Sequence, residues 1–340
     1  MISHHNRSDR TTDDYTHAVD LTVTPLARNH LAQQQTYPAP KSAHKGTGCI
    51  NEEDVRQLSV ENTPASLVVE AAIAIIINGI HYAVLMASPS QLEYLAIGFL
   101  FSEGLIQHRH ELLDWNITPL TTDSDFYPFS DPTNEEVNAS MLLDQLQDYD
   151  VYMVELVLNQ RCHQRIQAQR RQLAGRTGCG MCGITGLMQA LPDLSEYTKN
   201  KLQNIRQDNF QVTTSMPTLE ALLSIRAQID AAQHTHQLTG AVHAAGTLYH
   251  EQLYLFEDVG RHNALDKLIG WKLQHQADIE CVVMTSRLSI ELVQKSIRMQ
   301  IPWLVGMSAP TSTAVQVAQR YGLGLAGFLR DNRVTYYSGY

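Results

Sequence analysis

The second half of this chain alternates strand and helix patterns, and this alternation restricts its possible folds more than any other feature of the sequence. Short runs rich in Val, Ile and Leu predict strands, and the segments between them carry apolar residues at helical spacing. The expected strands are 241–249, 252–256, 280–285, 303–307 and 323–329, and the expected helices are 218–232, 263–273, 289–299 and 311–321. Such alternation predicts an α/β fold with a parallel or mostly parallel sheet and helices on both faces.

The first half predicts a smaller α+β unit. The expected elements are a strand over 66–77, a hairpin turn at Asn78-Gly79, a returning strand over 80–86, a helix from Ser88-Pro89 to Gly104 and a strand over 151–158. Residues 1–58 have no sustained apolar period, so we expect them to form a disordered tail. The acidic stretch over about 118–146 is expected to be a long surface loop.

These patterns divide the chain into four parts. We expect the tail over 1–58, an N-terminal α+β domain over 59–175 that includes the acidic loop, a cysteine loop and linker over 176–210, and a C-terminal α/β domain over 211–340.

Composition and charge exclude several classes of protein. A content of 44% hydrophobic and 18% charged residues suits a globular protein, and the formal charge of −10 argues against a general nucleic-acid coat. The apolar run 67–77 contains Glu70 and is too short to span a bilayer, and the N-terminus lacks the layout of a signal peptide. Five cysteines are an odd number, which favours reduced thiols over a disulfide framework. We therefore expect a cytoplasmic protein.

Two cysteines lie two residues apart in the glycine-rich segment 177–183, which reads Thr-Gly-Cys-Gly-Met-Cys-Gly. Glycine lets the backbone adopt positive φ and approach a ligand closely, which a packed structural cysteine would not need. The arginines that precede this segment favour the thiolate form of a nearby cysteine. Those arginines are Arg161, Arg165, Arg170, Arg171 and Arg176. Cys179 and Cys182 are therefore candidates for a reactive thiol site.

Other interpretations of these cysteines stay open on the residues alone. A structural zinc site would need two more ligands, and Cys162-His163 is the nearby pair that could supply them. A thioredoxin-like dithiol is a further alternative. Of the histidines, we expect His243 on a strand to belong to the core, and His262 at a helix start is the better functional candidate.

Polar residues follow each of four expected strands, at the edge of the sheet where ligands bind in α/β folds. Ser or Thr begins two of the helices that follow, where capping and anion binding are both possible. Arg261, Arg287, Arg330 and Arg333 are expected at this same edge. The sequence therefore predicts a broad anion-binding rim.

Several segments together resemble the formate dehydrogenase accessory proteins, the FdhD sulfurtransferases. The resemblance covers about residues 66–337. The matching segments are 96–104, 176–183, 239–245, 257–267, 285–295, 308–312 and 327–333. It implies a C-terminal three-layer sheet similar to that of cytidine deaminases, with helices on both faces, beside a smaller N-terminal α+β domain.

The resemblance also implies a cytoplasmic sulfur carrier that takes persulfide sulfur from a cysteine desulfurase. The acceptor it implies is the bis-molybdopterin guanine dinucleotide molybdenum cofactor, bound as substrate before it enters formate dehydrogenase. Because this cofactor has two equivalent halves, we expect a homodimer. We expect no stably bound metal of its own, and the charge and hydropathy noted above predict no nucleic acid and no membrane as partners. Deaminase chemistry is not expected, because His243-Ala244-Ala245 lacks the glutamate of zinc deaminases and the cysteine pair precedes it.

By resemblance, Cys179 carries the persulfide and Cys182 is an assisting thiol. The family segment that contributes to cofactor binding matches Phe328, Leu329, Arg330, Asp331, Asn332 and Arg333. This chain departs from the family at Asp331-Asn332, where glycine is frequent, and in its longer tail and acidic loop. The alternatives are a cofactor-binding chaperone that moves no sulfur and a dithiol oxidoreductase.

Overall fold

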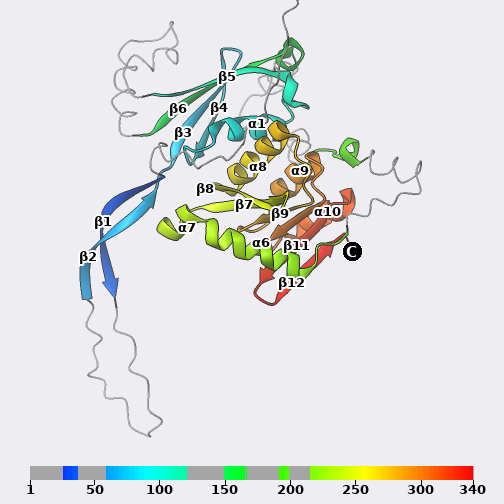
Figure 1. The fold of residues 1–340 in the computed structure, drawn as a ribbon. Coiled ribbons are helices and arrows are strands. Elements are labelled where there is room, and N and C mark those ends of the chain that lie inside the picture. The colour runs from blue at the N-terminus through cyan, green and yellow to red at the C-terminus, as the bar shows by residue number, and fades with distance from the viewer. Residues whose placement is uncertain are drawn as a thin grey trace, which may run out of the picture.

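The protein is a mixed α/β fold with two sheets and a projecting two-stranded ribbon (Figure 1). The computed structural model describes residues 26–36, 59–120, 149–164, 166, 191–198 and 215–339. Within these residues, no helix is long and apolar enough to cross a membrane.

The larger sheet has six strands and occupies the C-terminal part of the chain. Its strands are β7 (His243–Tyr249), β8 (Gln252–Asp258), β9 (Cys281–Met284), β10 (Trp303–Gly306), β11 (Gly324–Arg330) and β12 (Arg333–Ser338), in the order β12-β11-β10-β9-β7-β8. Of its neighbouring strand pairs, only β9–β10 and β10–β11 are parallel. The expectation of a mostly parallel sheet is therefore wrong, because β7–β8 and β11–β12 are hairpins and a tight hairpin pairs its strands antiparallel.

Helices cover both faces of this sheet, as expected. The helices of the C-terminal part are α6 (Leu219–Ala232), α7 (His234–Thr239), α8 (Arg261–His275), α9 (Ile290–Arg298) and α10 (Ser312–Tyr321). Val282, Met284 and Leu304 share a core with residues of α8, α9 and α10. Their neighbours Val283 and Trp303 point the other way, into a core with α6. Successive side chains of the buried strands thus pack into two separate cores, one on each face of the sheet. The fold therefore has three layers: helices, sheet and helices.

A four-stranded sheet in the order β4-β3-β6-β5 forms the N-terminal unit. It consists of β3 (Ala71–Ile77), β4 (Ile80–Ala87), β5 (Leu112–Pro119) and β6 (Val151–Leu158), with α1 (Leu92–Ser102) and the short 3₁₀ helix η1 (Arg109–Glu111). The predicted hairpin at Asn78-Gly79 is confirmed, with φ of 50° and 75° at these two residues.

Helix α1 joins the two units by packing closely on α8. A methyl group at Gly98 would overlap the backbone carbonyl of Asp266, and one at Gly270 would overlap the carbonyl of Tyr94. Each helix therefore presents a glycine to the backbone of the other. Larger side chains at these two positions would push the helices, and with them the two sheets, apart.

Part of the predicted tail forms a strand, which corrects the expectation that residues 1–58 are wholly disordered. Strand β1 (Ala27–Thr36) pairs antiparallel with β2 (Ser59–Val68), and the two project from the body as an arm (Figure 1). Most of their side chains are exposed. Hydropathy alone missed β1, because backbone pairing between two strands does not require a buried apolar face.

Other boundaries also differ from the sequence-based expectations. The strand expected over 66–77 is two strands, β2 and β3, and the helix expected from Ser88 begins at Leu92. Strands β5 and β12 and helix α7 were not predicted. The acidic loop expected over about 118–146 begins within the end of β5. The rest of it from residue 121, and most of the linker, lie outside the described residues, so the four-part domain division stays a prediction.

Candidate functional site

The carboxyl ends of β8, β9, β10 and β11 lie at one edge of the six-stranded sheet, which we call the carboxyl edge. β8 and β9 are both antiparallel to β7, so they run in the same direction as each other and as β10 and β11. Helices α8, α9 and α10 follow three of these strands and begin at this edge. The predicted convergence of polar junctions is confirmed.

The junctions after β9 and β10 run side by side and hold each other. Leu288 and Pro310 form a parallel bridge, and Thr311 N donates to Leu288 O at 3.0 Å. Thr311 also caps α10, since its side chain accepts from Ala314 N at 3.3 Å. Ser289 occupies the same position before α9, but its side chain makes no capping bond. Helix capping therefore accounts for the role of the Thr311 side chain. The Ser289 hydroxyl is not used for capping and can make another contact.

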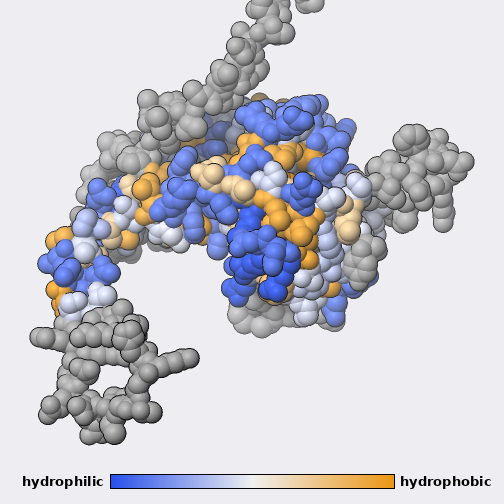
Figure 2. All heavy atoms as spheres, turned by 60° about the horizontal axis from the view of Figure 1, so that its bottom comes forward, coloured by the Kyte–Doolittle hydropathy of each residue, from blue (hydrophilic) through white to orange (hydrophobic). Residues whose placement is uncertain are grey.

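Four arginines lie at the carboxyl edge or in the turn that extends it. Arg261 begins α8, and its buried Nε has no hydrogen-bond partner among the described residues. Arg287, Arg330 and Arg333 are exposed. None of the four forms an ion pair with a carboxylate of the described part. Figure 2, which turns the bottom of Figure 1 forward, shows hydrophilic surface beside hydrophobic patches on this face of the molecule.

Two histidines lie at the same edge, His243 at the start of β7 and His262 in the first turn of α8. Both are half-buried, so the expectation of a core position for His243 is wrong. Burial lowers the pKa of each, and the positive charge of Arg261 lowers it further. His262 Nε2 lies 3.4 Å from the Ser289 hydroxyl, which links α8 to the start of α9. The edge thus holds two imidazoles that favour the neutral form.

The segment expected to bind the cofactor forms the end of β11 and its turn into β12. Phe328 has φ of 53° at an irregularity of the β11–β12 pairing, and its N–H donates to Ser308 O at 3.1 Å. The left-handed residue is thus Phe328, and neither Asp331 nor Asn332 has positive φ. The departure from glycine in this turn therefore imposes no backbone strain there.

The side chains of this segment point to different surroundings. Arg330, Asp331, Asn332 and Arg333 are exposed, whereas Leu329 is fully buried in the core below α6. Leu329 can therefore contribute to a surface site only through its backbone. Arg226 of α6, which the sequence analysis did not single out, binds Asp331 at 2.9 Å. Arg226 lies four residues before Asp230 and pairs with it. This spacing of opposite charges in the sequence could have indicated a charged face of α6.

A fully buried ion pair supports the carboxyl edge from below. Lys267 Nζ lies 2.7 Å from Asp258 Oδ2, and both side chains have no exposed surface. Lys267 Nζ also donates to the carbonyls of Ser88 and Glu257, and Ser88 N donates to Asp258. The pair thereby ties the loop before α1 to the end of β8. Buried charges are tolerated only when paired and hydrogen-bonded, and here both conditions are met.

A second ion pair links α1, α8 and α9. Lys295 Nζ lies 2.5 Å from Asp266 Oδ2, and the Ser102 hydroxyl donates to Asp266 Oδ1 at 2.6 Å. Asp266 and Lys267 are adjacent in the chain, so one segment of α8 carries both networks. These contacts connect the segments 96–104, 257–267 and 285–295 in the fold.

The two candidate catalytic cysteines, Cys179 and Cys182, lie outside the described residues, as do the arginines between 165 and 176. Cys162 and Cys281 are described, and both are buried. Burial raises the pKa of Cys281 to about 12, so its thiol stays protonated and is a poor nucleophile. Cys281 is therefore a core residue, as expected.

The segment that follows the cysteines is anchored at the opposite end of the sheet. Residues 191–198 pack against the ends of α9 and α10, where Leu194 is buried. The guanidinium of Arg298 lies over the Tyr197 ring at 5.3 Å. This side, where α8, α9 and α10 end, is called the amino edge below. Cys179 is twelve residues before Leu191, a distance of at most about 40 Å along an extended chain. Chain length therefore permits Cys179 to reach either edge.

No group of three or more His, Cys, Asp or Glu side chains that could hold a metal ion occurs within the described ranges. The zinc-site interpretation of Cys179 and Cys182 concerns residues outside those ranges and is not tested.

Comparison with known proteins finds one family over most of the chain. Residues 68–340 match the FdhD/NarQ family. The "Sulfur carrier protein FdhD" of Shewanella oneidensis is 34% identical over 79% of this chain and 83% of its own length. Proteins of the same name from Acinetobacter baylyi and Chromobacterium violaceum are 34% and 38% identical, over 80% and 77% of this chain and 86% and 84% of their own lengths.

The fold is also similar to that of a solved structure from Desulfotalea psychrophila, described as a formate dehydrogenase accessory protein. The TM-score is 0.52 at 17% identity, covering 91% of this chain and 96% of the other. At that identity the similarity concerns the fold alone.

Proposed function

The chain belongs to the FdhD/NarQ family, and from this premise we propose that it is a sulfur carrier in formate dehydrogenase maturation. In this proposal it accepts persulfide sulfur from a cysteine desulfurase and transfers it to the bis-molybdopterin guanine dinucleotide molybdenum cofactor. The observation that carries the sulfur-carrier role is the identity of 34–38% to proteins named for that role, over more than three quarters of the chain.

The cysteines of this chain support Cys179 as the sulfur acceptor. Two of the five cysteines, Cys162 and Cys281, are buried and inaccessible to a partner protein. The remaining three are Cys49, Cys179 and Cys182. Only the last two have the glycine-rich, arginine-flanked surroundings that favour a reactive thiolate. A carrier also needs reduced thiols, which is why we place it in the cytoplasm.

Sulfur loading is a thiol–persulfide exchange. The Cys179 thiolate attacks the terminal sulfur of the donor persulfide, a new S–S bond forms, and the donor cysteine leaves as its thiolate. In the second step the Cys182 thiolate attacks Cys179. The terminal sulfur then leaves as sulfide towards the acceptor, and a Cys179–Cys182 disulfide forms. A cellular dithiol returns this disulfide to two thiols, so electrons balance over the cycle.

The carboxyl edge supports the proposed acceptor. The cofactor carries two pyrophosphates and two guanines. The edge offers the guanidinium groups of Arg287, Arg330 and Arg333 beside helix N-termini, and none of the three pairs with a carboxylate of the described residues. Phe328, in its left-handed conformation, offers a half-exposed ring next to them. We therefore propose that residues 328–333, with Leu329 acting through its backbone, hold the nucleotide part of the cofactor.

The partners follow from the same proposal. They are a cysteine desulfurase as sulfur donor, formate dehydrogenase as cofactor recipient, and a second copy of the chain in a homodimer. A cofactor with two equivalent nucleotide arms suits a two-fold symmetric carrier.

Mass spectrometry after incubation with an active desulfurase and labelled cysteine tests the sulfur step. We expect one added sulfur on the peptide that contains residue 179, its loss in Cys179→Ala, and its retention in the control Cys49→Ala. Sulfur loading that persists in Cys179→Ala at the level of the unmodified protein would disprove the assignment.

The competing function is a cofactor-binding chaperone that moves no sulfur. It predicts that no sulfur is transferred to this chain from a desulfurase that is active on another acceptor. It also predicts cofactor delivery that is the same in Cys179→Ala and the unmodified protein.

A further inference from the structure

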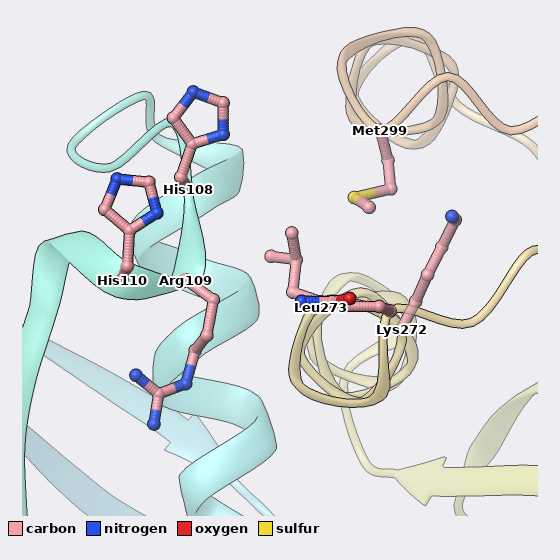
Figure 3. Close-up of a pocket in the computed structure, with 7 residues that line it drawn as sticks. His108, Arg109, His110, Lys272, Leu273 and Met299 are labelled. Carbon is pink, nitrogen blue, oxygen red and sulfur yellow. The ribbon is translucent and has the colours of Figure 1, made fainter.

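A pocket of about 390 Å³ lies at the amino edge, between the N-terminal unit and the ends of two helices (Figure 3). Its wall on one side is η1 with the residue before it, and on the other side the end of α8 and the residue after α9. In Figure 3 the rings of His108 and His110 stand on one side, and Lys272, Leu273 and Met299 on the other. Pockets of this size between two structural units are frequent sites for small ligands.

The ionisable residues that line the pocket are all basic. They are His108, Arg109, His110 and Lys272. Neither Arg109 nor Lys272 forms an ion pair with a carboxylate of the described residues. Burial lowers the pKa of Lys272, and the negative charge of Asp278 opposes this shift. In a chain with a formal charge of −10, four basic side chains without a carboxylate in the lining are a local exception. The pocket therefore favours an anion.

Within the described residues, each of these two cations uses only part of its hydrogen-bond donors. Lys272 Nζ donates to the Ala277 carbonyl at 2.8 Å, and this bond uses one of the three donors of an ammonium group. Arg109 donates one bond to the Leu112 carbonyl at 2.9 Å, while its guanidinium stacks on Trp115. These contacts fix the two side chains in place. A ligand would thus meet a pre-positioned ammonium group and would not have to order it.

His108 and His110 lie on one side of the pocket as a stacked pair. Their rings stack with centroids 5.2 Å apart and an angle of 10° between planes. The carboxylate of Glu111 accepts the backbone N–H groups of Gln107 and His108, which holds this short turn together. Leu273 and Met299 add apolar surface beside the polar groups. The pocket therefore combines an anion-binding side with an apolar side.

We propose that this pocket binds a small phosphate monoester whose organic part lies against Leu273 and Met299. Imidazole and ammonium donors suit the phosphate oxygens, and the volume is larger than a lone oxyanion needs. The site is separate from the carboxyl edge, because α8 and α9 begin there and end here. It goes beyond the proposed sulfur transfer and does not depend on it.

Calorimetry on the full chain tests the proposal with three probes: phenyl phosphate, inorganic phosphate and benzoate. We expect phenyl phosphate to bind more tightly than either of the other two. The double variant His108→Ala/His110→Ala should weaken its binding about tenfold, and so should Lys272→Met, because charged hydrogen bonds are lost. His234→Ala, an exposed histidine outside the pocket, is the matched control.

Histidine side-chain NMR supplies a second readout that does not depend on affinity. Phenyl phosphate should shift the ring signals of His108 and His110 and leave those of His243 and His262 unchanged. The variant Arg330→Ala/Arg333→Ala should retain phenyl phosphate binding, which separates this site from the proposed cofactor site. Unchanged affinity in both pocket variants, or no binding of phenyl phosphate at millimolar concentration, would overturn the proposal.

Discussion

The two edges of the six-stranded sheet differ in what the chain places there. At the carboxyl edge three helices begin, and Arg261, Arg287, Arg330 and Arg333 form no ion pair with a carboxylate of the described residues. At the amino edge the same helices end, and residues 191–198, which follow the cysteine pair, are anchored to them through Tyr197. The proposed nucleotide site and residues 191–198 thus lie at opposite ends of the same helices.

The difference teaches that separate contacts support the two edges of one sheet. The carboxyl edge rests on the buried pair of Asp258 and Lys267, whereas residues 191–198 at the amino edge are held by Arg298 and Gln300 through Tyr197. Damage to one support should therefore affect one edge more than the other.

The largest expected effect comes from breaking the support of the carboxyl edge. Lys267→Met leaves Asp258 buried without its partner, so we expect a loss of about 3–5 kcal/mol in the free energy of unfolding. Urea unfolding followed by circular dichroism measures it. Lys295→Met is the matched comparison, and its cost should be smaller because Lys295 is partly exposed.

A double variant checks the cause of that loss. Asp258→Leu combined with Lys267→Met removes both charges, so it should recover part of the stability that the single variant loses. A loss below 1 kcal/mol in Lys267→Met would show that the pair does not support this edge.

Gly98→Ala breaks the contact between α1 and α8. On an isolated helix this change is stabilising, but here the methyl group would overlap the Asp266 carbonyl. We expect a loss of about 1–3 kcal/mol in the free energy of unfolding, as for other overpacked sites. Gln274→Ala, at an exposed position of α8, should change stability by less than about 0.5 kcal/mol. A stability gain in Gly98→Ala would contradict the close packing of the two helices.

Arg330 and Arg333 extend the comparison from stability to ligand affinity. With GDP as a probe for the nucleotide part of the cofactor, Arg330→Ala/Arg333→Ala should weaken binding about tenfold, because two charge-assisted contacts to phosphate are lost. Fluorescence or calorimetric titration measures the dissociation constant. Arg320→Ala, at an exposed position near the end of α10, serves as the control and should bind GDP as the unmodified protein does.

The smallest expected effect is a pH dependence of stability from the carboxyl edge. Burial lowers the folded-state pKa of His243 and His262, so the unfolded chain binds more protons than the folded protein below about pH 6.5. The contribution of these histidines to the free energy of unfolding should be fully present above that pH. It should decrease as the pH falls towards their lowered folded-state pKa. Thermal unfolding between pH 5 and 8 measures it, and His262→Gln should reduce the dependence. The same slope in His262→Gln would exclude this histidine as a cause.

Much of the C-terminal fold was predictable from the sequence, because buried strands and amphipathic helices have clear periods there. Helix α6 begins directly after Thr218, whose side chain caps it, and the turn at Asn78-Gly79 has the expected conformation. The edge strands β5 and β12 were missed because only one residue in each is buried and hydropathy hardly marks them. Strand β1 was missed for the same reason.

The candidate site was predictable in part. The four arginines and the polar junctions could be placed at one edge from strand direction alone. The inward position of Leu329 and the left-handed conformation of Phe328 could not, because both depend on an irregularity in the β11–β12 pairing. The burial of the Asp258–Lys267 pair also required the fold, since charged residues in sequence usually indicate a surface.

The most direct test of the two-edge account measures sulfur loading and GDP binding side by side in two variants. We predict that Cys179→Ala abolishes sulfur loading from the desulfurase and keeps the GDP affinity of the unmodified protein. Conversely, Arg330→Ala/Arg333→Ala should keep sulfur loading and lose GDP affinity. If Cys179→Ala still accepts sulfur, or if the arginine variant binds GDP as tightly as the unmodified protein, the account is contradicted.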